Sequence, residues 1–180
     1  MTGGLPTAVQ LAMLANRLAL HHMRGKGQVP ATVLITTESV TYEFVSPALT
    51  DIAAKDKLVQ TARLLAIANQ AQAVTVLLEC WARFSREPGG ALGCRQEAVV
   101  IATETRDGPQ VSLLGIDRRR NGRFKSFSKV EIPAITTLAG RFAGLLPPKV
   151  PTAQDINQAK ILLGLFGIQP DGKPISAHLN

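Results

Sequence analysis

Basic side chains are concentrated between Arg106 and Lys129, where seven of them face only two acids, Asp107 and Asp117. The densest part of this segment consists of Arg118, Arg119, Arg120, Arg123 and Lys125. Guanidinium groups bind phosphate and guanine through paired hydrogen bonds, so this clustering favours an anion-binding or nucleic-acid-binding site. A solvated turn that uses arginine for solubility is the alternative interpretation.

The dipeptide Asn121-Gly122 is the strongest hairpin signal in the chain, and it predicts a basic hairpin over residues 117–126. A turn at this dipeptide would place Arg120 opposite Arg123, and Arg118 opposite Lys125. Like charges directly across a ladder are destabilising, so their presence favours a role in binding an anion. The aromatic content is only 4%, which argues against stacking on unpaired bases.

The candidate for a reactive thiol is Cys94, which follows a glycine-bearing segment in the predicted 85–96 loop. Arg95 beside it would favour the thiolate. A nucleophile also needs a base, and the three histidines lie far from Cys94 in sequence. Cys80 falls on the apolar face of a predicted strand, which is typical of a small buried residue.

Other catalytic and metal-binding patterns are missing from the sequence. His21 and His22 are adjacent, so on a helix they point about 100° apart and cannot hold one metal ion from the same face. The carboxylates are scattered singly, which gives no paired-acid or metal site. The glycines of residues 89–93 are not followed by Lys-Ser/Thr, so they do not match a phosphate-binding loop. We therefore predict no catalytic residue, no metal and no cofactor.

The first third of the chain predicts a helix, a β region and a second helix. Thr7 and Gln10 form a capping box that begins the first helix, and Gly25 can end it. Residues 31–45 are rich in β-branched and aromatic side chains, which indicates a hairpin. The second helix begins near residue 46 or 50 and ends near Gln72.

Residues 74–132 predict a four-stranded antiparallel meander. A turn at residues 106–109 and a turn at Asn121-Gly122 fix its register. The first turn pairs Val99 with Ile116, Ile101 with Leu114, and Glu97 with Arg118. The second turn pairs Ile116 with Phe127, Leu113 with Val130, and Leu114 with Lys129. The last pair places a charge opposite an apolar residue, which indicates a bulge or an edge strand.

The C-terminal part predicts a short helix over residues 135–146 and a last helix that begins at Thr152 and Asp155. Residues 168–180 are expected to form a loose tail. A chain of 180 residues with 46% hydrophobic and 18% charged content is long enough to bury one core. We expect a single α+β domain over residues 1–167, with an antiparallel β-meander packed against helices that cover one sheet face.

The second sheet face would also be apolar, so we expect either a second helical layer or a homo-oligomer, most simply a twofold dimer. No run of apolar residues is long enough to span a membrane, and a cytoplasmic location is expected. The formal net charge of +7 favours nucleic acid or an acidic protein as partner.

Three functions follow from these patterns. The first is a non-enzymatic binding or assembly module that self-associates. The second is a nucleic-acid-binding protein that acts through the basic hairpin at 117–126. The third is a small enzyme that uses Cys94 in the 85–96 loop.

Overall fold

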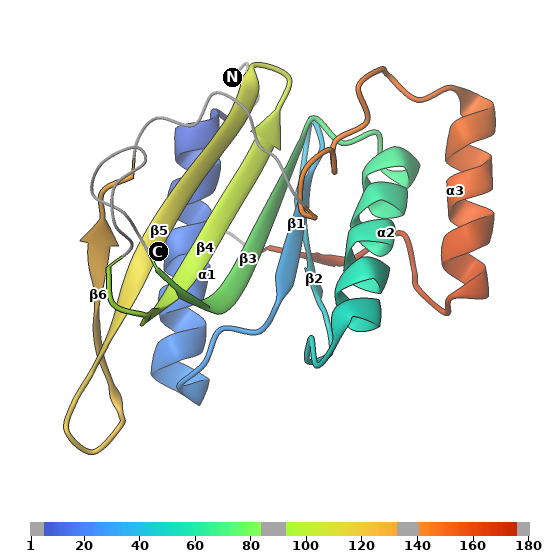
Figure 1. Cartoon of the computed structure of the whole chain (residues 1–180). Helices are drawn as coiled ribbons and strands as arrows, with labels where there is room; N and C mark the ends of the chain where they lie inside the picture. Colours follow the sequence, from blue (N-terminus) through green and yellow to red (C-terminus); the bar gives the residue numbers. More distant parts are fainter. Residues whose placement is uncertain (1–5, 84–92, 133–140, 176–180) are drawn as a thin grey trace.

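The computed structural model describes residues 6–83, 93–132 and 141–175 (Figure 1). Within these ranges the chain forms three helices and one seven-stranded antiparallel sheet, which confirms the α+β class. The strand order across the sheet is β6-β5-β4-β3-β1-β2-β7. The elements are α1 (Ala8–Lys26), β1 (Thr32–Thr36), β2 (Thr41–Val45), α2 (Ile52–Ala68), β3 (Ala73–Ala82), β4 (Gln96–Thr105), β5 (Gly108–Arg118), β6 (Phe124–Val130), α3 (Ala153–Leu165) and β7 (Lys173–Pro174).

Side-chain caps begin each of the helices. The capping box of Thr7 and Gln10 is confirmed for α1, and Thr152 with Asp155 forms the same motif at α3. Asp51 caps α2 by accepting a hydrogen bond from the Ala54 amide at 2.7 Å. These oxygens satisfy amides that have no partner inside the helix.

The end of α1 differs from the prediction. The left-handed residue that ends the helix is Gly27, with φ of 71°, and Gly25 lies inside the last turn. Arg24 and Lys26 also lie in that turn, where positive charge suits the negative end of the helix dipole. Helix α1 therefore ends two residues later than expected.

Helices cover both faces of the sheet, so helices are not confined to one face, and the second helical layer that the sequence left as an alternative is present. Successive side chains of a strand point to opposite faces. Val33 and Ile35 pack in the cluster that contains α2, whereas Leu34 and Leu77 pack in the cluster that contains α1. Helix α3 lies outside α2, as Figure 1 shows. The second helical layer thus comes from the same chain over β1 and β3.

The predicted register between β4 and β5 is wrong by two residues. Val99 pairs with Leu114 rather than Ile116, and Ile101 pairs with Ser112 rather than Leu114. The turn consists of only two residues, Arg106 and Asp107, because Thr105 pairs directly with Gly108. A shift of two residues leaves every side chain on its predicted face. Glu97 and Arg118 consequently still meet, although they are diagonal neighbours.

The register between β5 and β6 is confirmed away from the turn. Leu113 pairs with Val130 and Ile116 with Phe127, and the awkward pair of Leu114 and Lys129 is present. The edge-strand explanation holds for that pair, since β6 is an edge of the sheet.

The tip of this hairpin is not the predicted two-residue turn. The Gly122 amide donates to the Arg119 carbonyl, and the Arg119 amide donates to the Arg123 carbonyl, both at 2.8 Å. The loop therefore has three residues, with Gly122 at a positive φ of 77° and a bulge between Asp117 and Arg118.

As a result, Arg118 pairs with Phe124, so the predicted pairing of Arg118 with Lys125 is wrong. The predicted pairing of Arg120 with Arg123 is wrong as well, since Arg119 bonds to Arg123. The bulge removes the predicted pair of Arg118 and Lys125, whereas one like-charge pair remains at the tip, with Arg119 opposite Arg123.

Two C-terminal predictions are also corrected. Residues 141–146 are not helical, because the Glu104 carboxylate accepts the amides of Gly144, Leu145 and Leu146 at 2.6–3.0 Å. The rest of that predicted helix, residues 135–140, lies outside the described residues. The part of the tail from 168 to 175 is packed rather than loose, since β7 pairs with β2. Most of the predicted 85–96 loop and residues 176–180 lie outside the description.

Candidate functional site

A basic hollow of about 810 Å³ lies between the end of α1 and the β5–β6 hairpin. Its charged lining consists of Arg24 from α1 and of Arg118, Arg119, Arg123 and Lys125 from the hairpin. Met23, Gly27, Asn121, Gly122 and Phe124 complete the lining. The sequence predicted the hairpin cations, but Arg24 is added only by the fold, because it is remote in sequence.

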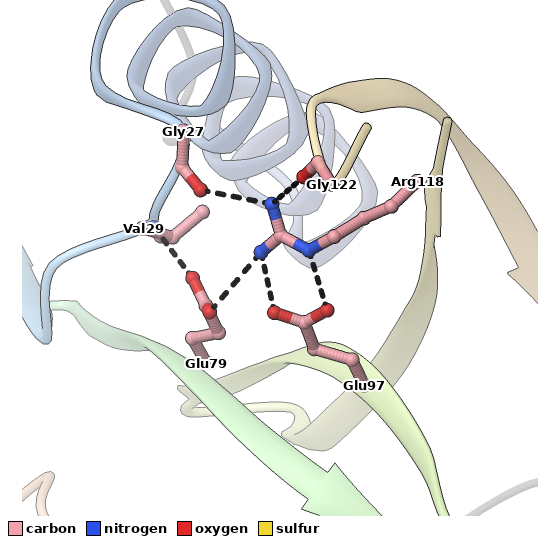
Figure 2. A network of polar contacts seen from close by, with 6 residues as sticks. All are labelled: Gly27, Val29, Glu79, Glu97, Arg118 and Gly122. Carbon is pink, nitrogen blue, oxygen red and sulfur yellow. Dashed lines mark hydrogen bonds and ion pairs between the residues drawn. The ribbon is translucent and has the colours of Figure 1, made fainter. Parts of the chain in front are cut away.

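The Arg118 guanidinium points toward Glu79, Glu97 and the end of α1 (Figure 2). Its Nε donates to Glu97 Oε2 at 2.7 Å and its Nη2 donates to Glu97 Oε1 at 2.5 Å, which is a bidentate ion pair. Its Nη1 donates to the carbonyls of Gly27 and Gly122, both at 3.3 Å. The structure thus uses Arg118 to join α1, β4 and the hairpin tip.

Glu79 is the second carboxylate of this network, and sequence reasoning missed it. Its Oε2 accepts the Val29 amide at 2.7 Å, and its Oε1 lies 3.8 Å from Arg118 Nη2. Alternation along β3 places Glu79 on the same strand face as Trp81. The contact with Val29 depends on the path of the chain after α1, for which the sequence gives no signal.

The two carboxyl groups are electrostatically different. Burial raises the pKa of Glu79, against the effect of the Val29 hydrogen bond. The hydrogen bonds from Arg118 lower the pKa of Glu97 and raise that of the guanidinium. Arg118 therefore stabilises charge mainly on Glu97. We call Arg118, Glu79 and Glu97 the arginine latch.

The other cations of the cluster are available to a ligand. Arg24, Arg119, Arg120, Arg123 and Lys125 are exposed. In the part of the chain that the structure describes, the ion pairs involve His22, Arg118 and Arg141 as the basic partners, and none of these five. Because α1 turns its negative end toward the basic hollow, attraction of an anion comes from the side chains and not from the helix dipole.

The two aromatic rings near the tip are already packed. Phe124 and Phe127 lie edge to face, with ring centroids 4.9 Å apart, and both pack against the core cluster that contains α1. Both rings are half-buried, and only Phe124 lines the hollow. The hairpin therefore presents charge without an aromatic platform.

The thiol and imidazole candidates do not converge. Cys94 is exposed, and burial raises the pKa of Cys80, which makes that thiol less reactive. His22 Nε2 lies 3.4 Å from Glu43 Oε1, so this histidine pairs with β2. Among residues 6–83, 93–132 and 141–175, Cys94 has no hydrogen bond to a histidine or a carboxylate.

No group of three or more metal-ligating side chains occurs in the described residues, and none of their helices is long and apolar enough to cross a membrane. When the chain is compared with known proteins, no family model matches it, and no curated protein or solved structure matches it either. Fold and site together define an α+β protein with a cationic hollow at one end of its sheet.

Proposed function

We propose that this protein is a non-enzymatic binding module whose partner is a nucleic-acid duplex, contacted through the basic hollow and the hairpin at 117–126. The observation that carries the proposal is a set of five exposed cations that form no ion pair within the described ranges; four of them line the hollow, and Arg120 lies beside it in the hairpin loop. Such a cluster attracts phosphate groups by its long-range field.

A duplex fits better than a single strand. The rings of Phe124 and Phe127 are half-buried against the core cluster that contains α1 and pack against each other, which disfavours stacking on a run of unpaired bases. A two-stranded β-ribbon has the width of a major groove, and the β5–β6 hairpin projects from the sheet in Figure 1. The arginine latch would hold this hairpin at a fixed angle to α1, which reduces the entropy lost on binding.

Removal of the outward cations tests the proposal. The variant R119A/R123A/K125A keeps Arg118, and should weaken binding to a labelled DNA duplex of mixed sequence by roughly two orders of magnitude at ~0.1 M salt. Fluorescence anisotropy measures this affinity. The matched control is K55A/K149A/K160A, which removes the same charge from exposed lysines outside the basic hollow.

Equal losses in the two variants would show that only net charge matters, and would contradict a site at the basic hollow. An acidic protein is the competing partner. Binding to poly-glutamate as tight as binding to DNA would favour that partner and overturn the nucleic-acid proposal.

Self-association is the second candidate, and exposed apolar side chains on α3 favour it. Ile161 is 66% exposed, Leu165 is 76% exposed, and Phe166, which follows the helix, is 46% exposed. Burial of such residues against a second copy would stabilise a dimer. Light scattering at micromolar concentration should then give a dimer mass, and L165D should give a monomer. A monomeric mass for the unchanged protein overturns this candidate.

The enzyme alternative stays a prediction. Its test is selective alkylation of Cys94 with loss of some turnover, and C94S is the variant that should then be inactive.

A further inference from the structure

Trp81 is the only tryptophan of the sequence, and it is 59% exposed near the end of β3. Arg95, which precedes β4, lies over its ring, with the guanidinium carbon 5.4 Å from the ring centroid. This distance is within the range of a cation–π contact. The indole therefore presents a flat aromatic surface that has a positive charge beside it.

The indole lines a cleft of about 510 Å³ at the edge of β3. Among the described residues, β1 pairs with β3 only as far as Leu77, whereas β3 continues along β4 to Ala82. The cleft follows the edge that this difference in length leaves open, and we call it the tryptophan cleft. Its lining includes Gln28, Val29, Pro30, Leu49, Leu78 and Trp81.

The tryptophan cleft adjoins the basic hollow. Gly27 lines the basic hollow, and Val29, two residues later, lines the cleft. Arg118 lines the basic hollow as well, whereas Glu79, whose Oε1 lies 3.8 Å from Arg118 Nη2, lines the cleft. Figure 2 shows these four residues side by side. The arginine latch thus lies between the two sites, and a ligand in one reaches the other over a short distance.

The charge around Trp81 is suited to a phosphate group. Both carboxylates of the latch lie on the strand face of Trp81, at 2.5 and 3.8 Å from Arg118 Nη2. Arg95 and Arg83, which follows β3, are exposed and belong to none of the ion pairs found among the described residues. Three guanidinium groups therefore face two carboxylates, and the positive charge of the basic hollow continues to the indole.

We propose that the tryptophan cleft binds an unpaired base next to a duplex held in the basic hollow, so that the target is a duplex with a single-stranded overhang. This inference rests on the proposed function and deepens it. Bases of every kind stack on aromatic side chains, so the contact is tolerant of sequence. Gln28 is exposed in the lining, and its amide can form hydrogen bonds with the edge of a base.

Three DNA duplexes that share one double-stranded part test the inference. The first is blunt, the second carries a three-nucleotide adenine overhang, and the third carries the same overhang without its bases. The abasic overhang keeps the phosphates, so it controls for charge. Fluorescence anisotropy of labelled DNA should show binding to the adenine overhang about tenfold tighter than to the abasic one, for an overhang at the 3′ or the 5′ end.

Variants of the ring assign this gain to Trp81. W81A should lose the tenfold gain and bind the blunt duplex as before, whereas W81F should keep much of the gain because a phenyl ring also stacks. The matched control is F166A, which removes an exposed ring outside the cleft and should bind all three duplexes as the unchanged protein does. Circular dichroism establishes that the variants fold.

Trp81 is also a reporter of its own contacts, since the protein has no other tryptophan. Its emission should be quenched by the adenine overhang and not by the abasic one. A change of emission with protein concentration in the absence of DNA would assign the cleft to a second copy and overturn the inference.

Equal affinity for the adenine and abasic overhangs, or an equal loss by W81A on the blunt and adenine duplexes, would overturn it too. Binding of the blunt duplex through the basic hollow would survive these results. Absence of all duplex binding would overturn the proposed function, and this inference with it.

Discussion

Two hollows of this protein are lined by different kinds of side chain, one mainly cationic and the other mainly apolar. The basic hollow is lined by cations of α1 and the β5–β6 hairpin. A second hollow, of about 680 Å³ and here called the apolar hollow, lies beside α2 and is walled by residues 166–175, here called the strap. Charge attracts a partner over a distance and weakens with salt, while apolar surface acts only on contact and is largely insensitive to salt. The same sheet therefore carries a cationic hollow beside α1 and a hollow with a mainly apolar lining beside α2.

The cations of the basic cluster also differ from one another in their contacts and exposure. Arg118 and Arg119 are neighbours in sequence, yet Arg118 is held by Glu97 and two carbonyls while Arg119 is exposed. An arginine in a basic cluster can thus be part of the scaffold that positions the others. The predictions below test this separation, beginning with the largest expected effect on stability.

Loss of Arg118 should be costly to the fold. R118M leaves Glu97 and Glu79 without their cation, and their side chains are only 15% and 24% exposed. We expect the free energy of unfolding in urea to fall by about 2 kcal/mol. R123M, at an exposed position on the same hairpin, should change it by no more than about 0.5 kcal/mol. Equal effects would mean that the latch does not exist in solution.

The strap should be sensitive to a single methyl group. G172A places a Cβ against the Phe44 ring, and should lower the free energy of unfolding by about 1 kcal/mol. Gly164 in α3 has open space around its missing Cβ, so G164A should raise stability by about 0.5 kcal/mol through higher helix propensity. A stabilising G172A would show that the strap does not lie on Phe44.

The pH dependence of stability should distinguish the two carboxyl groups of the latch. The pKa of Glu97 is lowered, so its contribution is present above the ordinary glutamate pKa of 4.5 and is lost as the pH falls through the lower folded value. E97Q should therefore be less stable than the unchanged protein at neutral pH, by about 1 kcal/mol, and the difference should shrink below pH 4.5.

The contribution of Glu79 to stability should depend on pH in the opposite direction. Its pKa is raised, so the folded protein gains stability as the pH falls through that raised value toward 4.5. E79Q keeps an oxygen for the Val29 amide and should be at least as stable as the unchanged protein at neutral pH. Urea denaturation of both variants across the acidic range measures the two differences. A loss of stability in E79Q equal to that in E97Q would contradict the assignment.

Local signals in the sequence predict much of this fold. Thr7, Thr152 and Asp51 cap the helices because their side chains reach nearby amides, and alternation along the strands gives the correct faces. These interactions span only a few residues. The pair of Glu97 and Arg118 was predicted despite the wrong register because a shift of two residues leaves each side chain on its predicted face.

The errors lie where several geometries compete. Hairpin loops of two, three and four residues are all common, and the sequence does not specify the three-residue loop at Gly122 or the two-residue turn at Arg106. Arg24, Glu79 and the strap join their sites through contacts between residues remote in sequence. Local patterns carry no information about such contacts.

The salt dependence of duplex binding tests the central claim most directly. If five outward cations contact phosphates, log K should fall with log salt with a slope of about −4.5, and the slope for R119A/R123A/K125A should be about −1.8. R123M should retain most of the slope of log K against log salt, and K55A/K149A/K160A should retain the full slope. A slope near zero for the unchanged protein, or the same steep slope for both triple variants, would contradict binding through the basic hollow.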